Sequence, residues 1–317
     1  MIVWILFITL IAIFLALDLG VFNKNPHEIS NKEASTWTGI WVSVALLFSI
    51  GVYFIFKNGW VENIDNLTPT TAMLKYITGY LIELSLSIDN IFVIAVIFTS
   101  FKIPKKFQHR VLFWGILGAI VFRALMILFG VFLIKKFDWI IYVFGAFLIF
   151  TALRMLFEKE DHQYDPKQSF VYKSVRKFMP ITTVINSQLF FIRKRGLLIA
   201  TPLFLALILI EFTDILFALD SIPAILAITS DPFLVFSSNI MAILGLRSMY
   251  FFLANMIERF SYLKYSLVAI LTYVGIKMIL SHHIEIPEWF SLSFIGVSLA
   301  AGVVFSLRSE KKVKIEQ

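Results

Sequence analysis

Long apolar segments alternate with short loops that carry most of the charge. A helix needs about 20 apolar residues to cross a hydrocarbon core of roughly 30 Å. Nine segments fit this template, at residues 2–20, 37–56, 72–100, 109–134, 138–156, 202–229, 234–256, 262–280 and 288–307. No long segment alternates apolar and polar residues as the strands of a membrane β-barrel do. The pattern predicts an all-α polytopic membrane protein with about nine transmembrane helices, folded as a single transmembrane domain over residues 1–317.

Basic residues are concentrated in alternate loops. If the N-terminus is outside, the loops after the first, third, fifth and seventh segments and the basic tail 308–317 are cytoplasmic, and with their margins they hold 21 of the 28 Lys and Arg residues. Because cytoplasmic loops are enriched in Lys and Arg, the chain is predicted to be N-out and C-in, as a multi-pass protein of the cell's inner (cytoplasmic) membrane. The first segment lacks a basic n-region and a small-residue cleavage site, so we expect it to be a retained span.

The longest loop, residues 157–200, is predicted to be cytoplasmic and to contain local structure. FVYKSVRKFM, from Phe170, places apolar residues opposite basic ones at helical spacing, which predicts an amphipathic helix on the inner leaflet. Two short apolar stretches flank Arg195 and Gly196 and indicate a hairpin. Thr201 and Pro202 form an N-cap and N1 pair that should start the sixth span.

Composition supports a membrane protein and excludes some kinds of site. The chain is 59% apolar and 15% charged, with a net charge of +7. The basic residues lie between apolar spans rather than on one soluble face, which favours anionic lipid headgroups over nucleic acid as the partner. Cysteine is absent, so disulfides and thiolate metal sites are excluded.

Two segments of the chain resemble each other. ELSLSIDNIFVI, from Glu83, aligns without gaps on DILFALDSIPAI, from Asp214. Downstream, the alignment superposes Arg123 on Arg247, and TALRML from Thr151 on VGIKMI from Val274. Each unit holds three spans, the third to fifth and the sixth to eighth, so the second unit must enter the membrane from the opposite side. We therefore predict an inverted-topology repeat, with repeat one at 69–156 and repeat two at 201–280, and a substrate site where the repeats meet.

Carboxylates occur deep within the third and sixth spans, where each is costly to place. Five are found there: Glu83, Asp89, Glu211, Asp214 and Asp220. Arg123 and Arg247 can neutralise two, which leaves three negative charges for protons or bound cations to satisfy.

The other polar groups nearby are also hard oxygen donors. The Asn90 amide and the Ser221 hydroxyl, together with the carboxylates, suit Mn²⁺, Mg²⁺ or Ca²⁺. Asp89 and Asp220 each follow the first acid of their segment by six residues, about 120° around a regular helix. They reach one cavity only if the helix unwinds or several of its faces are enclosed. Pro223 favours a break in the sixth span.

Structural roles are the alternative for several of these charges. Asp89 and Asp220 can be buried ion-pair partners of Arg123 and Arg247. Glu211 has no counterpart in the first repeat, which favours a structural role for it more than for the other acids.

ELSLSIDN from Glu83 and EFTDILFALDSIPAI from Glu211 resemble the two signature segments of the TerC/Alx family, related to the LysE-type transporter superfamily. The resemblance extends over most of the chain, including ATPLF at 200–204 and GLRSMYF from Gly245. It implies manganese export, with links to alkaline pH and a historical association with tellurite resistance. The family's signature acids fall on Glu83, Asp89, Glu211, Asp214 and Asp220, followed by Asn90 and Ser221.

We therefore expect a secondary transporter that exports a hard divalent cation, Mn²⁺ first, with proton antiport as one coupling. Mn²⁺ would be the substrate, and no permanently bound cofactor is expected. In this hypothesis Glu83, Asp89, Asp214 and Asp220 bind the ion with Asn90 and Ser221, while Arg123 and Arg247 tune the site or replace the ion when it is empty. The alternative is a scaffold or stress-response protein that acts through partners. We do not expect an enzyme, because the chain lacks the GxGD segment of intramembrane aspartyl proteases.

Overall fold

The computed structural model describes residues 2–17, 29–157, 166–182, 185, 188–194, 197–254, 262–281, 284 and 286–313. The acidic stretch of the long loop, the turn at Arg195 and Gly196 and the last residues of the tail lie outside this description.

Helices make up most of the described residues. In order they are α1 (Ile2–Leu17), α2 (Asn31–Lys57), α3 (Pro69–Ser100), α4 (Lys105–Lys136), α5 (Ile140–Phe157), α6 (Phe170–Phe178), α7 (Pro202–Leu226), α8 (Pro232–Leu253), α9 (Leu263–Leu280) and α10 (Glu288–Val313), with a 3₁₀ turn at Pro166–Gln168. Eight of them, α2–α5 and α7–α10, are long and apolar enough to cross a membrane. The all-α polytopic membrane fold is therefore confirmed. α1 has only 16 residues and extends about 24 Å, so the structure supports eight of the nine predicted spans by length.

Local sequence signals explain where several helices begin. Thr68 accepts a hydrogen bond from the backbone N–H of Thr71, and Pro69 occupies the first turn of α3. α7 begins at Pro202, directly after Thr201, as predicted. Asp231 caps α8 by accepting hydrogen bonds from the N–H groups of residues 233 and 234.

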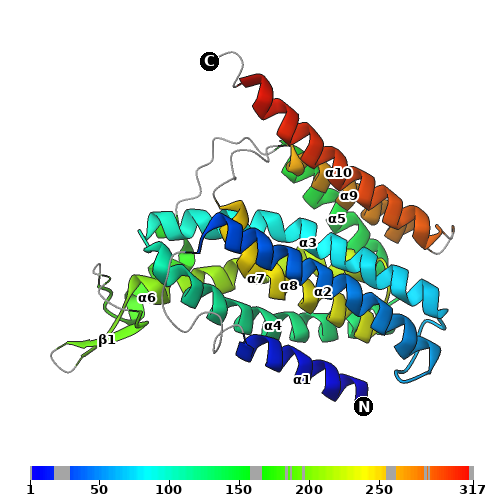
Figure 1. Ribbon diagram of the computed structural model, residues 1–317, viewed down its shortest axis with the longest axis horizontal. Coiled ribbons are helices and arrows are strands. Elements are labelled where there is room, and N and C mark those ends of the chain that lie inside the picture. The colour runs from blue at the N-terminus through cyan, green and yellow to red at the C-terminus, as the bar shows by residue number, and fades with distance from the viewer. Residues whose placement is uncertain are drawn as a thin grey trace.

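The described part of the long loop, residues 157–200, contains the predicted helix and hairpin. α6 covers Phe170–Phe178 and has no fully buried residue. β1 (Phe191–Lys194) pairs antiparallel with β2 (Leu197–Ala200), which confirms the hairpin. Both lie at the end of the bundle to which α3 runs, at the left of Figure 1.

The helices form two groups. The main bundle consists of α1–α4, α7 and α8, and α8 lies at its centre, since 89% of its apolar window is buried. α9 packs on both α5 and α10, and these three helices form what we call the arm. Figure 1 shows the arm close to α3 at the right of the view and diverging from it toward the left. We call the right-hand end, with the α2–α3 and α7–α8 loops, the outer end, following the predicted orientation.

Reciprocal contacts relate the two predicted repeats. α3 packs on α8, as α7 packs on α4. At the crossing of α5 and α9, Gly145 faces the carbonyl of Gly275 and Gly275 faces that of Gly145. Such exchange of roles is what an inverted repeat produces. The closest approach at this crossing pairs Gly145 with Gly275.

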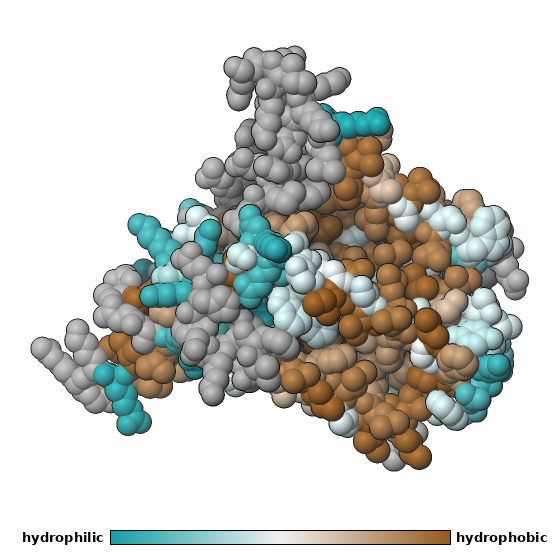
Figure 2. Space-filling view, viewed as in Figure 1, coloured by the Kyte–Doolittle hydropathy of each residue, from teal (hydrophilic) through white to brown (hydrophobic). Residues whose placement is uncertain are grey.

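The surface is apolar over the helices. Figure 2 shows brown hydrophobic residues over much of the bundle face, with teal residues toward its ends. Large apolar side chains are exposed along one face of α4, including Val121, Leu125 and Leu128. Such a band fits contact with lipid tails.

Candidate cation-binding site

The site is built where α3 and α7 cross in opposite directions. Near the outer end, Gly79 of α3 faces Ile225 of α7, and deeper in the bundle the Asn90 amide donates a hydrogen bond of 3.4 Å to Asp214. The same antiparallel register brings Glu83 level with Ser221. The first acid of each repeated segment, Glu83 or Asp214, therefore lies opposite the residue that follows the second acid of the other segment.

Arg123 of α4 joins the acids of the two repeats. Its side chain is 1% exposed. Its Nε and Nη2 donate to the two carboxylate oxygens of Asp214, at 3.1 and 2.7 Å, and its Nη1 pairs with Glu83. This bidentate geometry makes a strong, charge-assisted contact between largely buried side chains. One guanidinium thus lies between two carboxylates, which leaves one formal negative charge when all three are ionised.

Asn239 of α8 completes the cluster and was missed by the sequence analysis. Its Nδ2 donates to Glu83 Oε2 at 2.9 Å, and its Oδ1 accepts from Arg123 at 3.3 Å. The side chain is fully buried. An Asn within a transmembrane span was the available signal, because such residues need partners within the protein.

A cavity of about 550 Å³ adjoins this cluster, between the main bundle and the arm. Asp89 and Asp220 both line it, as do Glu83, Asn90, Arg123 and Ser221. Asp220 accepts a hydrogen bond of 2.9 Å from Thr151 of the arm. Asp214 does not line this cavity but a small neighbouring one, which Asn90 also borders.

Neither α3 nor α7 is broken at its acids. α7 runs without interruption from Pro202 to Leu226, and Pro223 falls in its last turn. The predicted break at Pro223 is therefore wrong for this structure. Asp89 and Asp220 reach the cavity without unwinding of either helix. They do so because α3 and α7 border the cavity along more than one of their faces.

Two buried oxygens at the site have no hydrogen-bond partner. These atoms are Asn90 Oδ1 and Ser221 Oγ. Asn90 and Ser221 are 5% and 1% exposed, so bulk water does not satisfy them. Unpaired buried acceptors are costly and rare in folded proteins, so these oxygens point to a missing ligand such as a cation or water.

Two predicted site residues lie away from this cluster. Glu211 packs against Gly118 of α4, on a face of α7 that does not border the large cavity. Arg247 lines a small cavity between α2 and α8, with Glu33 and Trp37. Among the described residues, no three His, Asp or Glu side chains converge as a ready-made metal site. Arg123 bridges Glu83 and Asp214.

Comparisons with known proteins agree on one relationship. The model of the family described as "Integral membrane protein TerC family" matches residues 68–314. A membrane protein of Myxococcus xanthus is 49% identical over 304 residues, covering 96% of this chain and 91% of that protein. The Alx protein of Escherichia coli, named as a candidate membrane-bound redox modulator, is 45% identical over 305 residues, covering 96% and 91%. A Rickettsia bellii membrane protein is 43% identical over 304 residues, covering 96% of both chains. No solved structure matches.

Proposed function

Because the chain belongs to the TerC family of integral membrane proteins, we propose that it is a secondary transporter that exports a hard divalent cation, most readily Mn²⁺, across the cytoplasmic membrane. The observation that carries the proposal is the buried contact of Arg123 with Glu83 and Asp214, next to oxygens that lack partners. A purely structural ion pair does not need unpaired acceptors beside it. A site that alternates between the Arg123 guanidinium and a substrate cation does need such acceptors, because they bind the substrate.

The chemistry of the donors suits the proposed substrate. Carboxylate, amide and hydroxyl oxygens bind Mn²⁺, Mg²⁺ and Ca²⁺ well, whereas Cu⁺ and Zn²⁺ favour Cys and His. The carboxylates of Glu83, Asp89 and Asp220 line the cavity and would meet an ion that enters it. Glu83 and Asp214 would bind it once the Arg123 guanidinium withdraws, with Asn90 and Ser221 completing the coordination.

Proton antiport is the coupling that these groups favour. A carboxylate in a low-dielectric site holds either a proton or a metal ion, so each ion bound releases protons. Export of one divalent cation would then be driven by protons moving inward.

Transport into proteoliposomes tests the proposal. Purified protein should move Mn²⁺ faster than Ca²⁺ or Mg²⁺, with a simultaneous change in internal pH. Asp89→Asn and Asp220→Asn should lower Mn²⁺ transport at least tenfold, whereas Asp138→Asn, in the exposed α4–α5 turn, should leave it unchanged. Wild-type rates in both site variants would refute the site, and absence of metal flux in the wild type would refute transport.

Action through a partner protein is the second candidate, and the cytoplasmic loop supports it. α6 exposes Phe170 and Phe178, at 81% and 85%, beside basic residues. The name of the E. coli relative indicates redox modulation. Because this chain has no cysteine for thiol exchange, such an activity would also need a partner protein or a cofactor. Deleting the loop should abolish a scaffold function and spare Mn²⁺ transport.

A further inference from the structure

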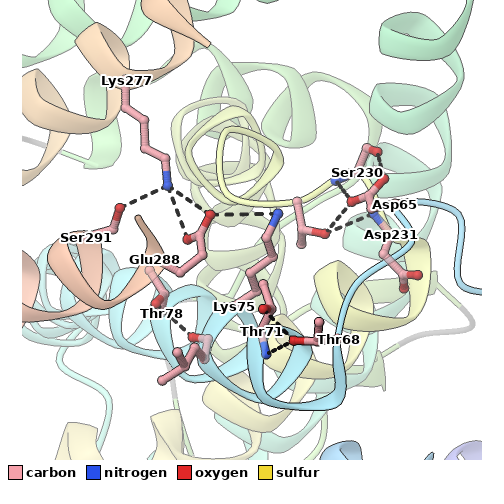
Figure 3. Close-up of polar contacts among 12 residues, drawn as sticks. Asp65, Thr68, Thr71, Lys75, Thr78, Ser230, Asp231, Lys277, Glu288 and Ser291 are labelled. Atoms are coloured by element: carbon pink, nitrogen blue, oxygen red, sulfur yellow. Dashed lines mark hydrogen bonds and ion pairs between the residues drawn. The ribbon is translucent and has the colours of Figure 1, made fainter. Parts of the chain in front are cut away.

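An ion cluster joins the arm to the main bundle at the outer end. Glu288, at the start of α10, lies 3.8 Å from Lys75 of α3 and 3.2 Å from Lys277 of α9. Lys277 also donates to the Ser291 hydroxyl at 2.9 Å. Figure 3 shows Glu288 between the two ammonium groups. One carboxylate therefore holds two cations that belong to different helix groups.

The contact between arm and main bundle is uneven along the bundle. Past the outer end, the arm diverges from α3 in Figure 1, while α10 stays on the α9 side: Ser266 donates to the Ser298 carbonyl at 2.7 Å, and the Tyr262 N–H donates to the Ser306 hydroxyl at 3.1 Å. The large cavity lies between the two groups. Its lining extends along α5 as far as Arg154 and Met155, near the inner end of that helix, and along α3 to Val93. The cavity therefore extends toward the inner end of the bundle, and Lys75, Lys277 and Glu288 at the outer end do not line it.

Resting on the proposed function, we infer that the cluster of Lys75, Glu288 and Lys277 is the outer gate of the transport path. With the cluster intact, the arm is closed on α3 and the site faces the cytoplasm. Separation of Glu288 from Lys75 would let the arm tilt and open the outer side. This assigns to Glu288 a role in access that is distinct from ion binding.

Charge explains why Glu288 would control the contact. The three side chains are 9–16% exposed, so solvent screens their interactions only partly. Replacing Glu288 by Gln leaves two ammonium groups facing each other with no anion between them, and their repulsion favours separation. Replacing Lys75 by Met removes the link between the groups while the Lys277–Glu288 pair within the arm remains.

A second polar cluster at the same end provides a matched control. Asp65 accepts hydrogen bonds from Thr229, at 2.9 Å, and from the Ser230 hydroxyl, at 2.6 Å (Figure 3). These residues join the α2–α3 loop to the α7–α8 loop, and both loops belong to the main bundle. Asp65→Asn therefore loosens the outer end without touching the contact between the groups.

Cysteine accessibility tests the gate, and the native chain offers a background free of cysteine. Thr78 is fully buried on α3, about one turn from Lys75 and deeper in the bundle. In Thr78→Cys protein, a membrane-impermeant maleimide added from outside should react slowly. Adding Glu288→Gln or Lys75→Met should speed the reaction at least fivefold, and adding Asp65→Asn should not. Asn58→Cys, exposed at the outer end of α2, normalises the labelling rates.

Mn²⁺ transport by the same variants separates the two proposals. If the wild type moves no metal, the proposed function fails, and the gate fails with it. If the wild type transports, the gate predicts faster labelling together with a Mn²⁺ transport rate changed at least twofold in Glu288→Gln and Lys75→Met. Unchanged labelling in folded variants, or faster labelling with unchanged transport, overturns it. Glu288→Asp, which keeps the charge, should behave like the wild type and shows whether position 288 tolerates substitution.

Discussion

Arg123 is the residue on which the buried charges of the site depend. Replacing it by Ala leaves Glu83 and Asp214 without their cation in a nearly solvent-free environment. Removing one partner of a buried ion pair typically costs about 3–5 kcal/mol. We predict a clear fall in the melting temperature of Arg123→Ala in detergent, and a partial recovery when Mn²⁺ is added, since a divalent cation can take the place of the guanidinium.

Arg247→Ala is the matched control for that experiment. Arg247 is also buried but lies beside α2, away from Glu83 and Asp214. Its replacement can lower the melting temperature, but added Mn²⁺ should not restore it. Equal recovery in both variants would show that Mn²⁺ acts elsewhere on the protein.

Asp231 should make stability depend on pH. Burial raises the pKa of Asp231, the cap of α8, to about 6, and the nearby Asp65 raises it further. The hydrogen bonds from the N–H groups of Leu234 and Phe233 and the charge of Lys135 oppose this increase. In the unfolded chain the pKa is about 3.9. Between these two pH values the folded protein binds more protons than the unfolded chain. The stabilisation from protonated Asp231 is therefore complete below about pH 3.9 and is lost as the pH rises to about 6.

Asp231→Asn isolates this effect, because Asn also caps helices well and does not titrate. Between pH 4 and 6.5 the wild type should lose stability relative to the variant, by on the order of 2–3 kcal/mol. Thermal melting at several pH values measures the difference. Parallel curves would mean that Asp231 does not titrate in this range.

At single positions, the sequence predicted the acids but not all of their partners. Glu83, Asp214 and Arg123 come together because charges within apolar spans must find one another. The repeat alignment equated Arg123 with Arg247, yet the side chains lie in different places. An alignment reports backbone correspondence, whereas the place of a side chain depends on its neighbours: α2, which lies outside both repeats, packs on α8 and lines a small cavity together with Arg247.

The crossing of α5 and α9 depends on two glycines. A Cβ on Gly145 would lie 2.9 Å from the Gly275 carbonyl oxygen, and one on Gly275 would lie 2.8 Å from that of Gly145. Since backbone atoms cannot move aside as side chains do, Ala at either position must push the helices apart. We predict a loss of about 1–3 kcal/mol for Gly145→Ala and for Gly275→Ala, measured by thermal melting. Gly296→Ala has open space and should be neutral or stabilising by up to about 1 kcal/mol.

Helices were easier to predict than their packing. Apolar length and the signals at Thr201 and Pro202 placed the spans closely, because both act within one segment of chain. The effect of Pro223 could not be read in the same way. A proline in a helix interior removes a backbone hydrogen bond and disrupts the helix, but within the last turn of α7 this disrupts little of the helix. The residue at which α7 ends depends on the helices that pack around it. The cavity also escaped prediction, since it depends on the angle between the arm and the main bundle.

The whole molecule carries its positive charge unevenly, and this asymmetry should fix its orientation. With their margins, the loops at the inner end and the tail hold 21 of the 28 Lys and Arg residues. Such loops are retained in the cytoplasm during insertion. α2 has 27 residues and spans about 40 Å, so its two ends should lie on opposite sides of the membrane.

Two single-cysteine variants of α2 test the orientation. On intact spheroplasts, an impermeant maleimide should label Asn58→Cys, whereas Thr36→Cys should react only after the membrane is permeabilised. Both residues are exposed, so the contrast depends on sidedness and not on burial. The opposite pattern would place the opening of the cavity outside the cell. The Mn²⁺ path proposed here would then load from the exterior, and the same cluster of Lys75, Glu288 and Lys277 would close its cytoplasmic end.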